Sequence, residues 1–184
     1  MAISLSTGLL ILRLVAGLTL AAHGAQKLFG WFGGPGISGT LQMQGRLGLK
    51  PAPLWAGLVI LGEFGGGLSV AFGFLTPLGA AGMFAAMFMA IAKGHWKNGF
   101  WSSKRGLEFP LILLAVGVAV GIMGPGNYSL DTLFGIALPE TLLFGILAVV
   151  ALLVDVIGLL ISRPPAVTPA EVSTSPAEVK PTAS

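Results

Sequence analysis

The sequence contains no cysteine in 184 residues. A chain without thiols forms no disulfide, carries out no dithiol exchange and ligates no iron–sulfur cluster. Any redox chemistry would therefore depend on a bound small molecule or on a partner protein. The strong metal or haem ligands that remain are two histidines, His23 and His95. A haem held by both is conceivable, but two lone histidines seldom form such a site, and we expect no metal site.

Charged residues are also scarce. They make up 9% of the chain, against about a quarter in soluble domains, and the mean hydropathy is +0.90. Several apolar runs approach the roughly 20 residues that a helix needs to cross a bilayer. These runs are Leu5–Leu28, Leu54–Leu75, Pro77–Lys93, Leu107–Met123 and Leu138–Ile161. The short alternating segments of a membrane barrel are absent, so the sequence predicts an all-α, polytopic membrane helical bundle.

Lysine and arginine are concentrated in alternate loops. They flank the loop after the first run, fill the loop after the third and recur after the last. The turn at Thr76-Pro77 and the loop Gly124–Pro139 carry none. The positive-inside rule then places the N-terminus outside and the C-terminus in the cytoplasm. No more than two basic residues adjoin, so the expected partner is the lipid bilayer and not a nucleic acid.

Three ionisable residues, Arg13, Glu63 and Asp155, lie inside apolar runs. Such a group costs about 2.5–3.5 kcal/mol on insertion scales, so it usually has a partner or a function. Glu63 stands in a glycine-rich stretch of the second run, where close helix packing is expected. Its estimated depth, about 13 Å, is compatible with Arg13 on the first helix. We therefore predict a structural ion pair between Arg13 and Glu63.

Other polar residues are expected in the cytoplasmic half of the bundle. On the first helix, His23 and Lys27 share a face with Arg13, although Lys27 could equally extend to the lipid headgroups. Glu108 opens the fourth run, where a helix N-terminus already favours a carboxylate. We predict a small-molecule site from residues that topology brings together, with a collapsed polar network as the alternative and with no catalytic residue assigned. The predicted ligand-binding residues are His23, Lys27, Glu63, Asn98 and Glu108.

Several short motifs resemble the DoxX family of integral membrane proteins. The most distinctive is His23-Gly24-Ala25-Gln26-Lys27-Leu28-Phe29-Gly30-Trp31-Phe32-Gly33-Gly34-Pro35-Gly36. It is accompanied by Glu63-Phe64-Gly65-Gly66-Gly67, Asn98-Gly99-Phe100, Glu108-Phe109-Pro110 and Gly124-Pro125-Gly126-Asn127-Tyr128-Ser129-Leu130-Asp131. The resemblance implies a compact four-helix membrane core in a bacterial or archaeal membrane, here the bacterial inner membrane. We therefore expect a DoxX-like bundle over residues 1–135, an additional transmembrane helix over 136–162, and a disordered Pro/Ala-rich cytoplasmic tail over 163–184.

The function that the resemblance implies is less specific than the fold. The family is named after a membrane subunit of thiosulfate:quinone oxidoreductase, which suggests a redox-associated subunit that binds a quinone or another small molecule in sulfur or oxidative-stress chemistry. Such a subunit would work with a soluble or membrane oxidoreductase partner, or as a homo-oligomer. The alternative is a non-catalytic membrane scaffold or small-molecule carrier. Whether the chain is an enzyme is left open by its residues.

Overall fold

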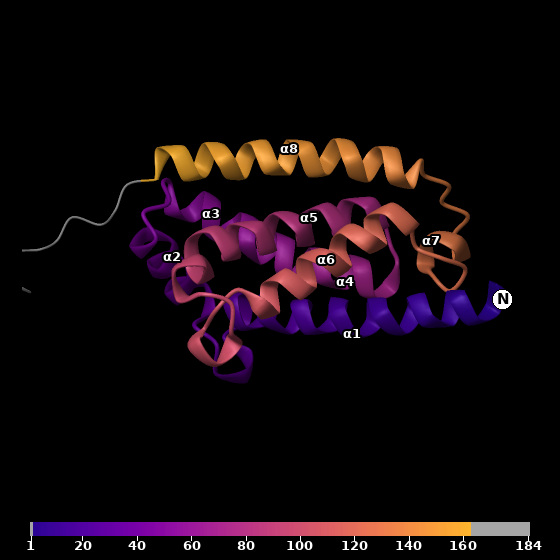
Figure 1. Cartoon of the computed structure of the whole chain (residues 1–184), viewed down its shortest axis with the longest axis horizontal. Helices are drawn as coiled ribbons and strands as arrows, with labels where there is room; N and C mark the ends of the chain where they lie inside the picture. Colours follow the sequence, from indigo (N-terminus) through magenta and orange to yellow (C-terminus); the bar gives the residue numbers. More distant parts are fainter. Residues whose placement is uncertain (1, 163–184) are drawn as a thin grey trace, which may run out of the picture.

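The computed structural model describes residues 2–162, which form helices and contain no strand (Figure 1). The predicted disordered tail, 163–184, lies outside the described residues. The α-helices are α1 (Ala2–Phe29), α2 (Gly36–Arg46), α3 (Ala52–Ile60), α4 (Gly66–Phe72), α5 (Thr76–Met89), α6 (Glu108–Met123), α7 (Leu130–Leu133) and α8 (Glu140–Ile161). Short 3₁₀ segments are η1 (Trp31–Gly33), η4 (Trp96–Asn98) and η5 (Ser102–Lys104), and π-helical turns are η2 (Leu61–Gly65) and η3 (Ala90–His95).

In the described part of the chain, four helices are long and apolar enough to cross a membrane. They cover Ser4–Phe29, Ala52–Phe72, Thr76–Asn98 and Glu140–Ile161. The helix α6 is apolar but has only 16 residues, which correspond to about 24 Å of rise. The prediction of a polytopic all-α membrane bundle is therefore confirmed.

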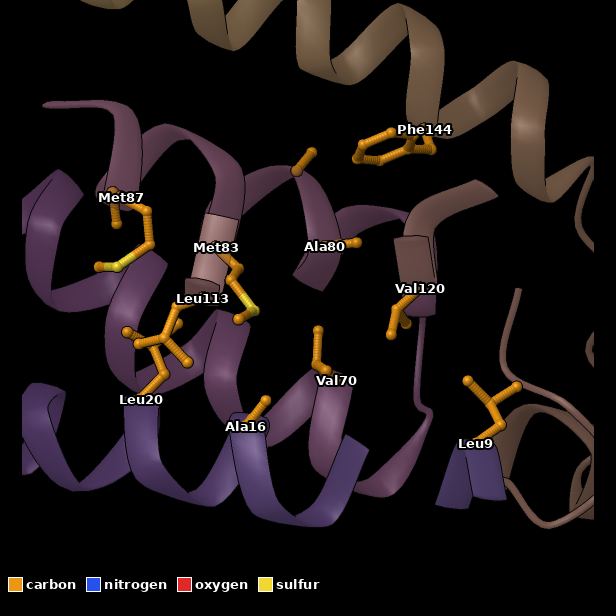
Figure 2. Close-up of a cluster of buried hydrophobic side chains, with 12 residues drawn as sticks. Leu9, Ala16, Leu20, Val70, Ala80, Met83, Met87, Leu113, Val120 and Phe144 are labelled. Atoms are coloured by element: carbon orange, nitrogen blue, oxygen red, sulfur yellow. The ribbon is translucent and has the colours of Figure 1, made fainter. Parts of the chain in front are cut away.

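The helices lie roughly parallel or antiparallel, with α1 and α8 on opposite sides of the bundle (Figure 1). Between them, α5 packs against α4, α6 and α8, whereas α1 packs mainly against α4 and η2. A cluster of buried apolar side chains from α1, α4, α5, α6 and α8 fills the interior, and includes Leu20, Val70, Met83, Leu113 and Phe144 (Figure 2). Each of these helices therefore contributes to one shared core.

Glycines let the second spanning helix approach both of its neighbours closely. A Cβ added at Gly17 of α1 would lie 2.6 Å from the backbone oxygen of Gly67 on α4. On another face of the same helix, a Cβ at Gly62 would lie 2.7 Å from the backbone oxygen of Gly82 on α5. Only residues without a side chain permit such contacts, as the glycine-rich stretch around Glu63 predicted.

The two ends of the bundle differ in charge. One end, which we call the basic end, comprises the last turn of α1, α2, the loop from α2 to α3, the start of α3 and the segment 93–108. Apart from Arg13, every Lys and Arg of residues 2–162 lies there. The other end comprises the start of α1, the α4–α5 turn and the loop from Gly124 to Pro139. We call it the clasped end, because hydrogen bonds of Arg13 and Asp131 connect its segments to one another.

Candidate functional site

A cavity of about 370 Å³ opens among the helices at the basic end. Its walls come from α1, α2, α3, η2, α5, η3, α6 and α8, and most are apolar side chains such as Leu20, Met87 and Leu113. A few polar side chains also line it; these are His23, Lys27, Gln44, Glu63, His95 and Asp155. A mostly apolar pocket with a few convergent polar groups is the usual form of a small-molecule site.

Glu63 reaches this cavity from the π-helical turn η2. This turn interrupts the continuous helix formed by α3 and α4, and π-helical turns occur frequently at functional sites. The Glu63 carboxylate is buried and accepts a hydrogen bond and ion pair from the Lys27 ammonium of α1. The side chain of Lys27 is itself 17% exposed, so it does not extend freely toward lipid headgroups. Each charge therefore compensates the other at the wall of the cavity.

His23 lies one turn before Lys27 on α1 and also lines the cavity. Its imidazole packs against the ring of Phe109 on α6, with ring centroids 5.4 Å apart. Within residues 2–162, the structure gives its ring nitrogens no hydrogen-bond partner. His23 can therefore donate to or accept from a ligand in the cavity, according to its tautomer.

The predicted ion pair between Arg13 and Glu63 is wrong. Arg13 is fully buried at the clasped end, where its guanidinium donates to the backbone oxygens of Pro125 and Tyr128. Gly73, at φ +62°, leaves room for this guanidinium, because a Cβ there would lie 2.1 Å from Nη1. The depth estimate failed because α3 begins beyond the end of α1, beside α2, so that Glu63 comes level with Lys27.

Asp131 of α7 supplies further hydrogen bonds of the clasped end, and we call Arg13 and Asp131 with their partners the clasp. Its Oδ1 accepts a hydrogen bond from Leu75 N at 2.8 Å, and its Oδ2 accepts from Thr76 N at 3.1 Å and Thr76 Oγ1 at 2.9 Å. Its own backbone N–H donates to Gly73 O at 2.9 Å. The motif from Gly124 to Asp131 thus has a structural role, since it ties α1 and the start of α5 to one loop.

Asn98 and Glu108, the other two predicted ligand-binding residues, lie outside the cavity lining. The Asn98 amide donates to Gly94 O at 3.3 Å and to Arg105 O at 3.1 Å. Glu108 accepts from Ser102 N at 2.9 Å. Both side chains order the basic-end segment 94–108, so the structure brings together His23, Lys27 and Glu63 but not these two.

Sequence reasoning did not assign Trp55 or Asp155 to the site. Trp55 of α3 and Asp155 of α8 are each 5% exposed, and both line the cavity. Asp155 stood out as a carboxylate in an apolar run, but its position on the last helix gave no sign of its neighbours. Gln44 of α2 is also buried at the cavity. Only the packing of α2 against α1 and α3, and of α8 against α5, reveals these three residues.

Comparison with known proteins agrees with this architecture. The sequence model of the DoxX family matches residues 8–96. Inner membrane protein YqjF of Escherichia coli (strain K12) is 34% identical over 128 residues, which cover 68% of this chain and 91% of the relative. No solved structure matches. The match to YqjF over nearly its whole length, together with the motifs around the cavity and the clasp, shows that this multi-pass membrane protein belongs to the DoxX family.

Proposed function

We propose that the protein binds a small, mostly apolar, ring-containing molecule of the quinone type in the basic-end cavity. The cavity itself is the observation on which this proposal rests. Its volume of about 370 Å³ is within the range of about 300–1,000 Å³ typical of ligand pockets. Its apolar walls suit a ring and the start of a hydrocarbon tail, and His23 with the Lys27–Glu63 pair supplies polar contacts for ring oxygens.

A titration of the purified protein in lipid nanodiscs with decylubiquinone tests this proposal directly. Ala90 lines the cavity, so Ala90→Phe should fill part of it and abolish binding. Ala115 is exposed on α6 and does not line the cavity, so Ala115→Phe is the matched control and should bind as the wild type does. Equal binding by all three proteins, or no binding by the wild type, would contradict the proposal.

The role that follows is a redox-associated membrane subunit. Because the chain has no cysteine, electrons would reach a bound quinone from a partner oxidoreductase or a second small molecule. A scaffold or carrier without turnover is the second candidate, favoured by the extensive structural use of Arg13, Asp131, Asn98 and Glu108. Reduction or oxidation of the bound quinone by a co-purifying oxidoreductase, lost in Ala90→Phe, would favour the redox role, whereas bound quinone without turnover would favour a carrier.

We further propose that the basic end faces the cytoplasm of a bacterial inner membrane, with the N-terminus outside. The segregation of Lys and Arg to one end supports this orientation through the positive-inside rule. Since the chain lacks cysteine, single cysteines at exposed Ser103 and Asn127 report on the two ends cleanly. A membrane-impermeant maleimide should label Asn127→Cys in intact cells and Ser103→Cys only after lysis. The reverse pattern would overturn the orientation.

A further inference from the structure

Two buried polar atoms in the lining of the cavity have no hydrogen-bond partner in the described part of the chain. One is the indole Nε1 of Trp55, and the other is the carboxyl Oδ2 of Asp155. A buried polar group without a partner costs free energy, and most such groups in native proteins are satisfied by something. The two groups are therefore candidates for contacts with a ligand.

The two groups belong to one region of the cavity wall. The Trp55 ring packs against Gly158 of α8, where an added Cβ would lie 2.1 Å from the ring. Gly158 follows Asp155 by one helical turn, so both residues present the same face of α8. Trp55 precedes Glu63 by about 12 Å of helical rise, which separates this region from the Lys27–Glu63 pair. The cavity thus has a second polar region on the wall formed by α3 and α8.

The chemistry of the two groups selects a ligand group. Indole N–H only donates a hydrogen bond, whereas a carboxylate oxygen accepts one. A hydroxyl satisfies both groups at once, because its oxygen accepts from Trp55 and its proton is donated to Asp155. A carbonyl or an ether oxygen pairs with Asp155 only when the carboxyl is protonated, whereas a hydroxyl pairs with either form because a carboxyl oxygen accepts in both. An ammonium group would leave Trp55 unpaired.

We infer that Trp55 and Asp155 bind the hydroxyl of a phenol-type ring, so that the cavity prefers a hydroxylated ring to its ether. This inference rests on the proposed function, because it specifies the ligand of the same cavity. For a quinone couple, it selects the reduced hydroquinone form over the quinone. The residues Trp55 and Asp155 then determine specificity, while the apolar walls provide affinity for the ring and tail.

A pair of matched probes tests the inference without redox chemistry. 4-Decylphenol and 4-decylanisole differ only by the exchange of a hydroxyl for a methyl ether. Binding of each to the protein in nanodiscs should show about a tenfold preference for the phenol, the size expected for a hydrogen bond that satisfies a buried group. Trp55→Phe and Asp155→Leu should each remove most of this preference and leave the affinity for 4-decylanisole nearly unchanged.

Two controls use similar substitutions away from the cavity. Trp96→Phe changes an exposed tryptophan of η4, and Glu140→Gln changes the first residue of α8. Both should keep the preference for the phenol, and thermal unfolding of each variant reports whether it folds. If wild type binds both probes equally, or if the Trp55 and Asp155 variants keep the preference, the inference fails and the cavity function stands. That result would also indicate that water satisfies the two groups. If neither probe nor decylubiquinone binds, both proposals fail.

Discussion

The buried polar groups at the two ends of the bundle differ in what they contact. At the clasped end, Arg13 and Asp131 bind backbone atoms, and both carboxylate oxygens of Asp131 have partners. At the basic end, Lys27 and Glu63 pair beside a cavity, and the unpartnered atoms of Trp55 and Asp155 belong to residues that line this cavity. The clasped end also has two buried atoms without a partner in the described residues, Arg13 Nε and Glu140 Oε2, but neither residue lines the cavity. A buried group whose hydrogen bonds go to backbone stabilises the fold. A buried group that faces open volume is available to a ligand.

Removal of the Arg13 guanidinium should produce the largest loss of stability. Arg13→Leu leaves the backbone oxygens of Pro125 and Tyr128 without their donors, and each unsatisfied buried group costs about 1–3 kcal/mol. The free energy of unfolding should therefore fall by about 2–6 kcal/mol, to be measured in mild detergent by thermal or chemical unfolding. A fall of less than about 1 kcal/mol would show that the clasp contributes little.

The effects of substituting Lys27 and Glu63 on the free energy of unfolding should be strongly coupled. Lys27→Met and Glu63→Leu each leave one buried charge uncompensated and should cost about 3–5 kcal/mol, whereas the double variant should recover most of that loss. Arg13→Leu combined with Glu63→Leu should instead be additive, since the two residues lie at opposite ends. Additivity for Lys27 and Glu63 would mean that they act independently and would contradict the pairing.

Substitution of Asp155 should raise the free energy of unfolding, whereas substitution of Arg13 should lower it. Asp155→Leu removes a buried carboxyl that has an unpartnered oxygen, so it should raise the free energy of unfolding of the ligand-free protein by about 1–3 kcal/mol. The measurement is thermal unfolding of Asp155→Leu and of the wild type in nanodiscs. A loss of stability would show that Asp155 has a structural partner and would remove the contrast between the two ends.

Trp55→Phe should have the smallest effect on stability. The shorter phenyl ring loses the contact that Cη2 and Cζ2 of the indole make with Gly158, whereas the lost indole N–H has no partner in the described residues. We expect the midpoint of thermal unfolding to fall by about 2–4 °C, the size expected for a loss of roughly 1 kcal/mol, while the phenol preference is lost. A large shift would mean that the indole nitrogen contributes to the packing of α3 against α8.

The sequence predicts the helical bundle well, because long apolar runs and segregated basic loops follow from the thickness and charge asymmetry of a membrane. It also predicts that Glu63 is packed among glycines and that His23 shares a face with Arg13, whereas for Lys27 it leaves both the interior and the lipid headgroups open. It could not predict which cation meets Glu63, since that depends on how far α3 extends past α1. Nor could it place Asp155 beside Trp55, because the packing of α8 depends on contacts between residues far apart in the chain.

The π-helical turn that carries Glu63 has a consequence for how the fold tolerates length changes. Such a turn holds one residue more than an α-helical turn in the same stretch, so the extra residue is absorbed locally. Deletion of Leu61 should let the segment become α-helical while α3 and α4 keep their register with α1 and α5. Glu63, at the middle of the turn, would then rotate by part of the roughly 100° that one helical residue represents, which changes its direction relative to Lys27. The packing of the second spanning helix and the direction of its carboxylate are thus encoded separately, and a single deletion could change one without the other.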